Sequence, residues 1–265
     1  MTPDIDEGLH LRLDDTEVDL DHLSPKFSYT YALSENAVTY GALRRGFRVP
    51  TSGQLFRSGE TEDSAEGLEP EIVNSLEFGV RGDANSKWAY EAAVYYLQGK
   101  DEIVRVVNQD TGSSRNENTG ETKHYGLELG STYQFSSTLR ASFAYSYSKH
   151  KFVDREGFDG NELQLAPHDV ANIQVAYEPD LLQGGQLVAE WAHQGEYFLD
   201  DENTETYAGH RLYNLRANYY VGLQFELYAK LFNVTDVKWA ETVNEFGNFT
   251  PGRPRTAQFG MKYTF

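Results

Sequence analysis

The sequence predicts an all-β protein, an antiparallel transmembrane β-barrel of which this chain supplies about eleven strands. Three observations lead to that fold class. Apolar and polar residues alternate in segment after segment, with the period of two that a two-faced strand requires. The connections between these segments are short and long in strict alternation. No apolar run is long enough for a transmembrane helix, since the longest covers only residues 92–97.

The last segment, Thr256–Phe265, shows the alternation most clearly. Its odd-numbered residues are Ala, Phe, Met, Tyr and Phe, and its even-numbered residues are Thr, Gln, Gly, Lys and Thr. A tilted strand needs about 9–11 residues to cross a bilayer, and this segment has that length. A soluble β-sandwich could also end on such a strand, so the rest of the chain has to decide whether its apolar face meets a core or lipid.

Composition narrows the classes of function. The chain has 265 residues, 14% of them aromatic, and its formal net charge of −18 argues against nucleic acid as a partner, because nucleic-acid binding needs basic patches. It contains no Cys, which excludes disulfides and thiolate metal sites. Its mean hydropathy of −0.60 resembles that of a soluble protein, but alternating lipid-facing and lumen-facing residues average to such a value. The first residues are acidic and show no signal-peptide pattern.

The first half of the chain contains two predicted pairs of strands. A polar stretch to about residue 25 precedes them, and in it only Leu9, Leu11 and Leu13 suggest a strand stub. Each pair is joined by a short turn and followed by a long polar segment, expected at residues 45–70 and 98–120. The alternating apolar residues of these strands lie in Phe27–Leu33, Val38–Ala42, Leu76–Val80 and Trp88–Tyr96.

The second half of the chain repeats this scheme, with long connections expected at residues 149–167, 192–209 and 236–255. The alternating segments are Tyr125–Leu129, Leu139–Tyr147, Ala171–Tyr177, Leu187–Trp191, Tyr213–Tyr219, Leu223–Leu231 and the terminal strand.

The sorted connections favour a membrane barrel over a sandwich. A barrel carries tight periplasmic turns on one rim and long outer loops on the other, whereas a sandwich has no reason to sort its loops by length. Charged residues in the middle of the strands support the barrel, because an unpaired charge in a sandwich core would be costly. On a sandwich they could instead face solvent from its outer surface. They are Glu77, Glu91, Glu128, Glu190, Glu226, Arg140, Arg216 and Lys230.

Several short motifs, in order along the chain, resemble those of TonB-dependent outer-membrane receptors of the siderophore-receptor type. They are Gly46–Thr51, Leu68–Glu71 leading into Ser75–Gly79, Asn118–Gly120 leading into Gly126–Glu128, Leu231–Asp236, and Pro251–Thr256 before a strand that closes on Phe265. The resemblance covers the chain from about residue 25 to its end. It implies a barrel of about 22 strands with an N-terminal plug, which imports ferric siderophores or similar scarce ligands with energy from the TonB system.

The departures from the family pattern suggest a C-terminal portion of such a receptor. Nothing resembles the plug or the TonB-contacting box, and about eleven strands amount to roughly half of the barrel. We therefore expect residues 1–25 to be an outer loop with a strand stub and residues 26–265 to be the C-terminal barrel portion. A sheet with two unpaired edges cannot be satisfied in a bilayer, so we expect the chain alone not to transport.

Candidate ligand contacts are expected in the outer loops. Arg45, Arg48 and Arg57 concentrate positive charge near one loop of an acidic chain, and Arg suits the oxygen-rich anions that ferric siderophores often are. These arginines could instead pair with nearby Glu60 or Glu62, or with lipopolysaccharide. Tyr197 and Trp239, aromatic residues of other predicted outer loops, complete the set.

No metal or catalytic site is predicted. Asp200, Asp201, Glu202 and Glu205 could bind a hard cation such as Ca²⁺, but their spacing is unlike that of an EF-hand. Single histidines, at positions 124, 168, 193 and 210 among others, are expected to be wall or loop residues rather than haem ligands. Mid-strand carboxylates could form an acid–base pair, but no nucleophile or phosphate-loop motif accompanies them, so we expect no enzyme.

The resemblance also implies partners and a location. We expect the outer membrane of a Gram-negative bacterium, with lipid and lipopolysaccharide around the barrel. The TonB system and the plug would act through the missing N-terminal part. The barrel-assembly machinery would act on the terminal strand, where Phe259, Tyr263 and Phe265 are the candidate residues. No cofactor is expected beyond the transported ligand, and the alternatives are a substrate-specific porin or a barrel enzyme.

Overall fold

The computed structural model describes residues 20–55, 67–107, 114–222, 224–243 and 248–265. Its main element is an 11-stranded sheet whose strands lie side by side in chain order. Each neighbouring pair is antiparallel. The strands are β1 Lys26–Ser34, β2 Ala37–Arg48, β3 Glu71–Ala84, β4 Trp88–Val107, β5 Ser114–Gln134, β6 Leu139–Asp154, β7 Asp169–Tyr177, β8 Gly185–Gln194, β11 His210–Val221, β12 Phe225–Phe232 and β15 Thr256–Tyr263. The predicted all-β antiparallel fold is confirmed.

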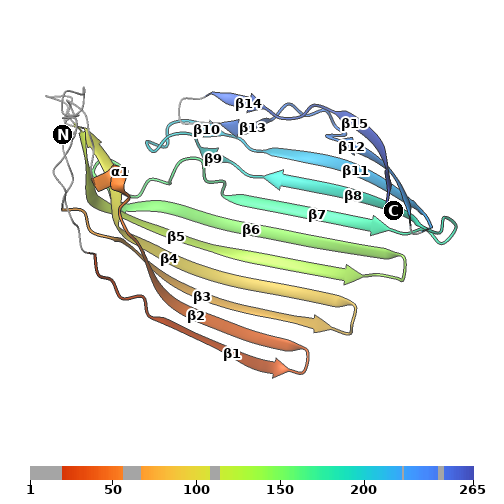
Figure 1. Ribbon diagram of the computed structural model, residues 1–265, viewed down its shortest axis with the longest axis horizontal. Helices are drawn as coiled ribbons and strands as arrows, with labels where there is room; N and C mark the ends of the chain where they lie inside the picture. The colour runs from red at the N-terminus through yellow and green to blue at the C-terminus, as the bar shows by residue number, and fades with distance from the viewer. Residues whose placement is uncertain (1–19, 56–66, 108–113, 223, 244–247) are drawn as a thin grey trace, which may run out of the picture.

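The two ends of the sheet differ, as the alternation of loop lengths predicted. The short connections between strands of the 11-stranded sheet lie at one end, on the right in Figure 1, together with the C-terminus. The long connections lie at the other end and carry the remaining small elements. These are α1 Ser52–Leu55, the two-stranded sheet of β9 Tyr197–Phe198 and β10 Thr206–Tyr207, and the two-stranded sheet of β13 Ala240–Val243 and β14 Phe249–Pro251. We call these two ends the turn end and the loop end.

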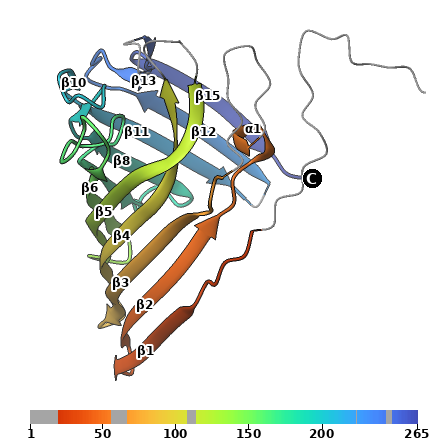
Figure 2. The ribbon, with the colours of Figure 1, turned by 90° about the vertical axis from the view of Figure 1, so that its left-hand side faces the viewer.

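The sheet has one apolar and one polar face and is bent into an open trough (Figure 2). Residues directly opposite each other on neighbouring strands share a face. Leu227 lies opposite Met261, whereas Lys230 lies opposite Gln258. The apolar face is widely exposed, with Phe259 at 78% and Met261 at 75% of their full accessibility. An exposed apolar face of this extent marks contact with another phase, and in a barrel that phase is lipid.

Lysines mark where the apolar face ends toward the loop end. On β5 and β6 the apolar face runs through Tyr125–Tyr133 and Leu139–Tyr147, and we take these ranges as the membrane-spanning segments. The next residues of the same face are Lys123 and Lys149, and Lys149 lies directly opposite Tyr125. Tyrosine followed by lysine is the order expected at a membrane interface.

The structure corrects the expected face of the second strand. Val38, Tyr40 and Ala42 were expected to form its apolar face, but Ala42 lies opposite Glu77 and Tyr40 opposite Gly79, so they belong to the polar face. The residues on the apolar face are instead Thr39, Gly41 and Leu43. Small residues on both faces make the alternation of this strand ambiguous.

The structure also replaces an expected loop with a tall hairpin. Residues 98–120 were expected to be a long polar connection, yet β4 continues to Val107 and β5 begins at Ser114. These upper parts lie beyond the apolar band. A strand with water on both faces needs no alternation, which is why the sequence pattern did not reveal it.

The long connection between β2 and β3 is held at its base by a small apolar cluster. Leu55 in α1 and Leu68 are both buried, and Ile103 of the tall hairpin packs against them. Across the described ranges of the chain, no helix has the length and apolar character needed to cross a membrane.

Candidate functional site

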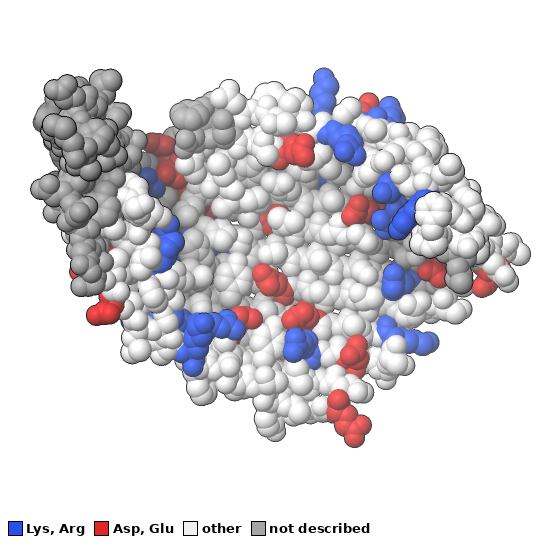
Figure 3. Space-filling model, in the orientation of Figure 1, with Lys and Arg blue, Asp and Glu red and all other residues white. Residues whose placement is uncertain are grey.

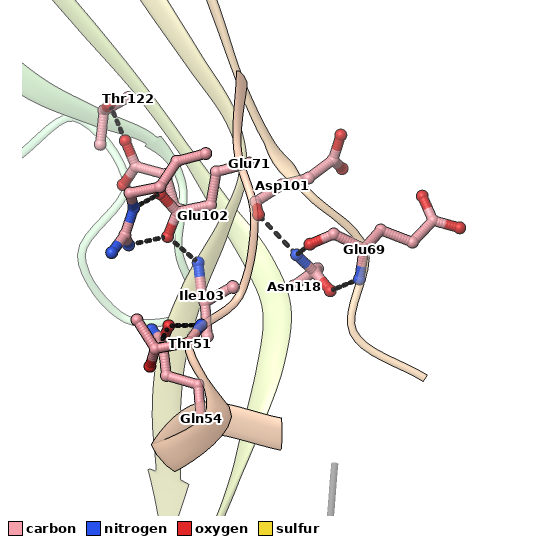
Figure 4. Close-up of polar contacts among 10 residues, drawn as sticks. Thr51, Gln54, Glu69, Glu71, Asp101, Glu102, Ile103, Asn118 and Thr122 are labelled. Carbon is pink, nitrogen blue, oxygen red and sulfur yellow. Dashed lines mark hydrogen bonds and ion pairs between the residues drawn. The ribbon is translucent and has the colours of Figure 1, made fainter. Parts of the chain in front are cut away.

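The base of the β2–β3 connection is fixed by an ion pair that also binds the tall hairpin. Arg48 at the end of β2 donates two hydrogen bonds to Glu71 at the start of β3, with Nε 2.7 Å from Oε2. The same carboxylate accepts the backbone N–H of Ile103 at 2.9 Å (Figure 4). The pair with Glu71 raises the pKa of Arg48, which therefore stays charged. The Glu71 carboxylate thus fixes the Arg48 side chain between β2 and β3.

Both described ends of the same connection are tied down by amide side chains. Asn118 on β5 accepts the N–H of Glu69 and donates to the carbonyls of Glu69 and Asp101 (Figure 4). On the other side of the gap, the side chain of Asn116 on β5 donates to the carbonyl of Gln54 at 3.0 Å. The described ends of the loop that carries Arg57 are therefore anchored to the hairpin.

The next two long loops, residues 155–168 and 195–209, are joined by a polar strut. The guanidinium of Arg155 lies 2.9 Å from Asp201 and packs over the ring of Phe152 at 4.5 Å. Asn203 accepts the N–H of Glu162 at 2.7 Å and donates to its carbonyl at 2.8 Å. The two loops thus form one unit at the loop end.

Glu162 is the electrostatic centre of this strut. Lys149 Nζ lies 2.6 Å from its carboxylate, Lys151 lies at 3.9 Å, and His168 forms a short hydrogen bond with it. Burial favours a raised pKa for Glu162, but the hydrogen bonds from Lys149 and His168 outweigh it, so the pKa is lowered. The folded strut therefore holds Glu162 as a carboxylate.

A cluster of aromatic rings lines the loop end between β9 and β13. The ring of Tyr197 is buried and lies 5.2 Å from that of Tyr207. The hydroxyl of Tyr207 is 3.2 Å from His210 Nδ1, and the His210 ring lies 4.5 Å from that of Trp239. Trp239 in turn donates to the carbonyl of Arg253 at 3.1 Å. Burial raises the pKa of Tyr197 and lowers that of His210, so both side chains favour their neutral forms.

The polar face forms the wall of the trough. Glu190 accepts hydrogen bonds from Asn172, Gln174 and Asn214 on the two neighbouring strands. Nearer the turn end, a hollow of about 740 Å³ is lined by side chains that include Arg81 and Glu91. Acidic and basic side chains are interspersed over the sheet in Figure 3. Such a wall suits a hydrated passage better than an apolar core.

The structure separates the predicted arginines and joins the predicted aromatic residues. Arg48 lies on the polar face of β2, whereas Arg45 lies on the apolar face with Leu43. The Nε atom of Arg45 is 3.3 Å from Nε2 of His22. Arg57 lies outside the described residues. Tyr197 and Trp239 belong to one cluster, linked through Tyr207 and His210. These two linking residues were missed as candidates, because Tyr207 lies within the connection expected at residues 192–209 and His210 directly follows it.

The loop acids hold the fold instead of gathering at a cation. Asp200 accepts hydrogen bonds from the backbone and side chain of Thr204, and these outweigh desolvation and lower its pKa. Asp201 accepts from Arg155 and from the N–H of Gln164. In the part of the chain that the structure describes, no three His, Asp or Glu residues gather as a metal-binding group.

The terminal strand lies at the free edge of the sheet. Phe259 and Tyr263 are on its apolar face, opposite Ala229 and Phe225 of β12. Phe265 is fully exposed beside Tyr263, with the ring centroids 4.9 Å apart.

Comparisons with known proteins agree with this architecture. Residues 8–234 match the family described as "TonB dependent receptor-like, beta-barrel". The chain is 33% identical over 116 residues to the ferrioxamine receptor of Yersinia enterocolitica, which covers 43% of this chain and 16% of that protein. It is 21% identical to a probable TonB-dependent siderophore receptor, PiuA, of Acinetobacter baumannii, over 97% of this chain and 38% of that protein.

Solved structures give the same picture of the fold. The copper transporter OprC superposes with a TM-score of 0.74 at 20% identity, over 91% of this chain and 39% of that one. The siderophore receptor PiuA from Acinetobacter baumannii superposes with a TM-score of 0.74 at 18% identity, over 90% of this chain and 35% of that one. The chain thus spans less than two fifths of the length of each of these proteins.

Proposed function

This chain belongs to the TonB-dependent receptor β-barrel family, and we propose on that basis that it forms the C-terminal barrel portion of an outer-membrane receptor for a ferric siderophore or a similar scarce ligand. The observation that carries the proposal is the two-faced 11-stranded sheet with all its long connections at one end. Its apolar face would meet lipid, its polar face would line the passage, and its loop end would meet the ligand first.

Lysines support the outward orientation of the loop end. Lys123 and Lys151 lie directly opposite each other on the apolar face, Lys123 next after Tyr125 on β5 and Lys151 next after Lys149 on β6. Two like charges in this position would repel unless an anion lies between or beside them. Glu162, 3.9 Å from Lys151, supplies one such anion, and the phosphate groups of lipopolysaccharide would supply another beside Lys123. The remaining partners of the proposal are the plug and the TonB system, and the barrel-assembly machinery at the terminal strand.

For the ligand contacts, we propose two regions of the loop end. One is the aromatic cluster with Tyr197 and Trp239, in which the buried ring of Tyr197 supports the part-exposed rings of Tyr207 and Trp239, on which a chelate can stack. The other is the anchored loop with Arg48 and Arg57, and Arg45 at its base. Because Arg48 is already paired with Glu71, an anionic ligand would have to compete with that carboxylate or use only the exposed edge of the guanidinium.

The receptor proposal has more support than a porin or a barrel enzyme. The matched family and the similar proteins are receptors and transporters. The loop end also differs from simple pore loops, because its connections are cross-linked by the Arg48–Glu71 and Arg155–Asp201 pairs. Such pre-organised loops suit recognition of one ligand class.

The proposal is tested in the bacterium that encodes the chain. Its coding region is disrupted, and uptake of ⁵⁵Fe from ferrioxamine B, from a ferric catecholate and from ferric citrate is measured under iron limitation. We expect the loss of one of the three activities and its recovery when the region is restored. Fractionation should place the protein in the outer membrane. Uptake of all three probes at the wild-type rate, with the protein absent from the outer membrane, would refute the proposal.

A further inference from the structure

Two histidines face each other on the polar face, just beyond the membrane-spanning band. His124 on β5 and His150 on β6 are direct cross-strand partners. Their Nδ1 atoms are 2.6 Å apart, and their ring centroids are 4.9 Å apart. Both side chains are half-buried. An imidazole pair in this position brings two nitrogen donors to one point.

A buried threonine and a carboxylate fix the protons of this pair. Thr122 is fully buried, and its Oγ1 lies 2.5 Å from Glu102 Oε1 and 3.0 Å from His124 Nε2. The carboxylate can only accept, so the single hydroxyl proton of Thr122 is donated to Glu102. Thr122 then accepts from the Nε2–H of His124. A neutral His124 therefore carries its lone pair on Nδ1, directed at His150.

The backbone is shaped to bring Glu102 into this chain of hydrogen bonds. The register of β4 against β5 shifts between Gly99 and Glu102, and Asp101 has a positive φ of 56°. This bulge turns Glu102 to the face that carries Gly99. Any β-carbon at Gly99 would collide with the Glu102 carboxylate and with Thr122 Oγ1. A bulge that re-aims one side chain is a frequent device beside functional sites.

We propose that His124 and His150 form a two-imidazole coordination site for a transition-metal ion of the Cu²⁺, Ni²⁺ or Zn²⁺ type. Both Nδ1 atoms bind the ion, and the Nδ1 proton of His150 moves to its own Nε2, so no proton is lost overall. Metal–nitrogen bonds of about 2.0–2.1 Å require the two nitrogens to separate from 2.6 Å to about 3.0–3.4 Å, which calls for a small rotation of the imidazole rings.

The surroundings match those of a metal-binding histidine. Such a residue usually donates its other ring N–H to a fixed acceptor that leads to a carboxylate, as His124 does through Thr122 to Glu102. No third protein ligand is gathered there among the described residues, so water or an arriving chelator fills the other positions.

The test uses the complete protein that carries this chain, purified in detergent micelles with a tag that contains no histidine. Cu²⁺ is titrated and followed by electron paramagnetic resonance, in which each bound nitrogen splits the signal. Zn²⁺ affinity is measured by competition with a chromophoric chelator. The variants are His124→Ala, His150→Ala and Thr122→Val, and the matched control is His22→Ala, which removes a histidine elsewhere in the described chain.

We expect coupling to two nitrogens in the unaltered chain and in the control, and its loss in either of the two site variants. Thr122→Val keeps the buried volume but breaks the link to Glu102, and should weaken binding by about 10- to 100-fold. A Cu²⁺ signal coupled to fewer than two nitrogens in the unaltered chain overturns the proposal whether or not the variants fold. A two-nitrogen signal that survives in both folded alanine variants also overturns it.

Discussion

The ring of Tyr40 lies over the α-carbon of Gly79, its direct cross-strand partner, and leaves no room for a β-carbon there. The Tyr40 hydroxyl continues past it to Glu91 at 3.1 Å. The same arrangement recurs in three more cross-strand pairs, which are Tyr29 over Gly41, Tyr95 over Gly126 and Tyr228 over Gly260. At these four positions a tyrosine ring therefore occupies the space that a glycine leaves on the neighbouring strand.

Gly79→Ala should consequently destabilise the sheet by about 1–3 kcal/mol, because the new methyl group displaces the Tyr40 ring from its position over residue 79. Gly130→Ala is the matched control, since the nearest atom to a β-carbon there is Glu91 Cβ at 3.9 Å. Alanine should be neutral at Gly130 or stabilising by about 0.5–1 kcal/mol. Urea unfolding in lipid vesicles of the complete protein that carries each variant measures both values. Equal effects would show that the Tyr40 ring does not depend on the missing side chain at Gly79.

A charge on the two faces of the terminal strand should have very different effects. Phe259→Arg places a cation on the lipid-facing side, at a cost of about 2–4 kcal/mol near the bilayer centre. Gln258→Arg places it on the polar face, opposite Lys230, where water screens the repulsion. We expect Phe259→Arg to reduce the protease-resistant fraction in the membrane strongly, and Gln258→Arg to reduce it little. If both lowered it equally, the assignment of the faces would be wrong.

Asn233 should be the least replaceable polar residue of the described loop end. Only 2% of it is exposed, and its side chain donates to the carbonyls of Val237 and Arg253 and accepts from the N–H of Val237. Its φ of 50° is one that Gly, Asn and Asp tolerate best.

Asn233→Ala should cost about 3 kcal/mol or more, because each buried group left without a partner costs roughly 1–3 kcal/mol. Asn233→Gly removes the backbone strain that alanine would have at this φ but does not restore the hydrogen bonds. It should therefore recover only part of the lost stability. Asn218→Ala, which removes one 3.3 Å bond to Gln186, is the control and should be nearly neutral. Full recovery by glycine would show that backbone strain dominates.

The strut between the two outer loops should weaken in acid. The pKa of Glu162 is lowered from its usual value of 4.5, so the carboxylate stabilises the folded loops above that pH and the contribution disappears as the pH falls through the lower folded value. The charge-assisted bonds should contribute about 1.5–3 kcal/mol at neutral pH. Glu162→Gln should remove most of this contribution.

The contribution of Glu162 to loop stability is measured between pH 3 and pH 7 by hydrogen exchange of residues 155–168 and 199–205, corrected for intrinsic exchange rates. We expect the difference between the unaltered chain and Glu162→Gln to decrease as the pH falls below 4.5. The control Glu178→Gln changes an exposed carboxylate at the turn end and should leave these loops unaffected. A difference that persisted unchanged at pH 3 would exclude the carboxylate as its source.

The sequence was sufficient for the strands that cross the membrane, because lipid on one side and water on the other impose a strict alternation. It was insufficient where that contrast fades. The upper parts of β4 and β5 have no lipid-facing side, and β2 carries small residues on both faces and a tyrosine on the polar one.

The candidate site was harder to predict than the fold. Arg45 and Arg48 are three positions apart, which on a strand places them on opposite faces, so their proximity in sequence did not make them one cluster. Tyr197 and Trp239 come together only through Tyr207 and His210, contacts that join four separate chain segments. Pairings of this kind depend on loop paths that single-sequence patterns do not encode.

The strand count of the sheet has a directional consequence. With 11 strands, each opposed to its neighbour, β1 and β15 run the same way. Joining these two edges directly would make a parallel seam, and so would a second copy inserted the same way up. A second copy could form antiparallel seams only upside down, with its long loops on the opposite side of the membrane. The described sheet is therefore completed only by a segment with an odd number of strands, which gives the even total found in bacterial outer-membrane barrels.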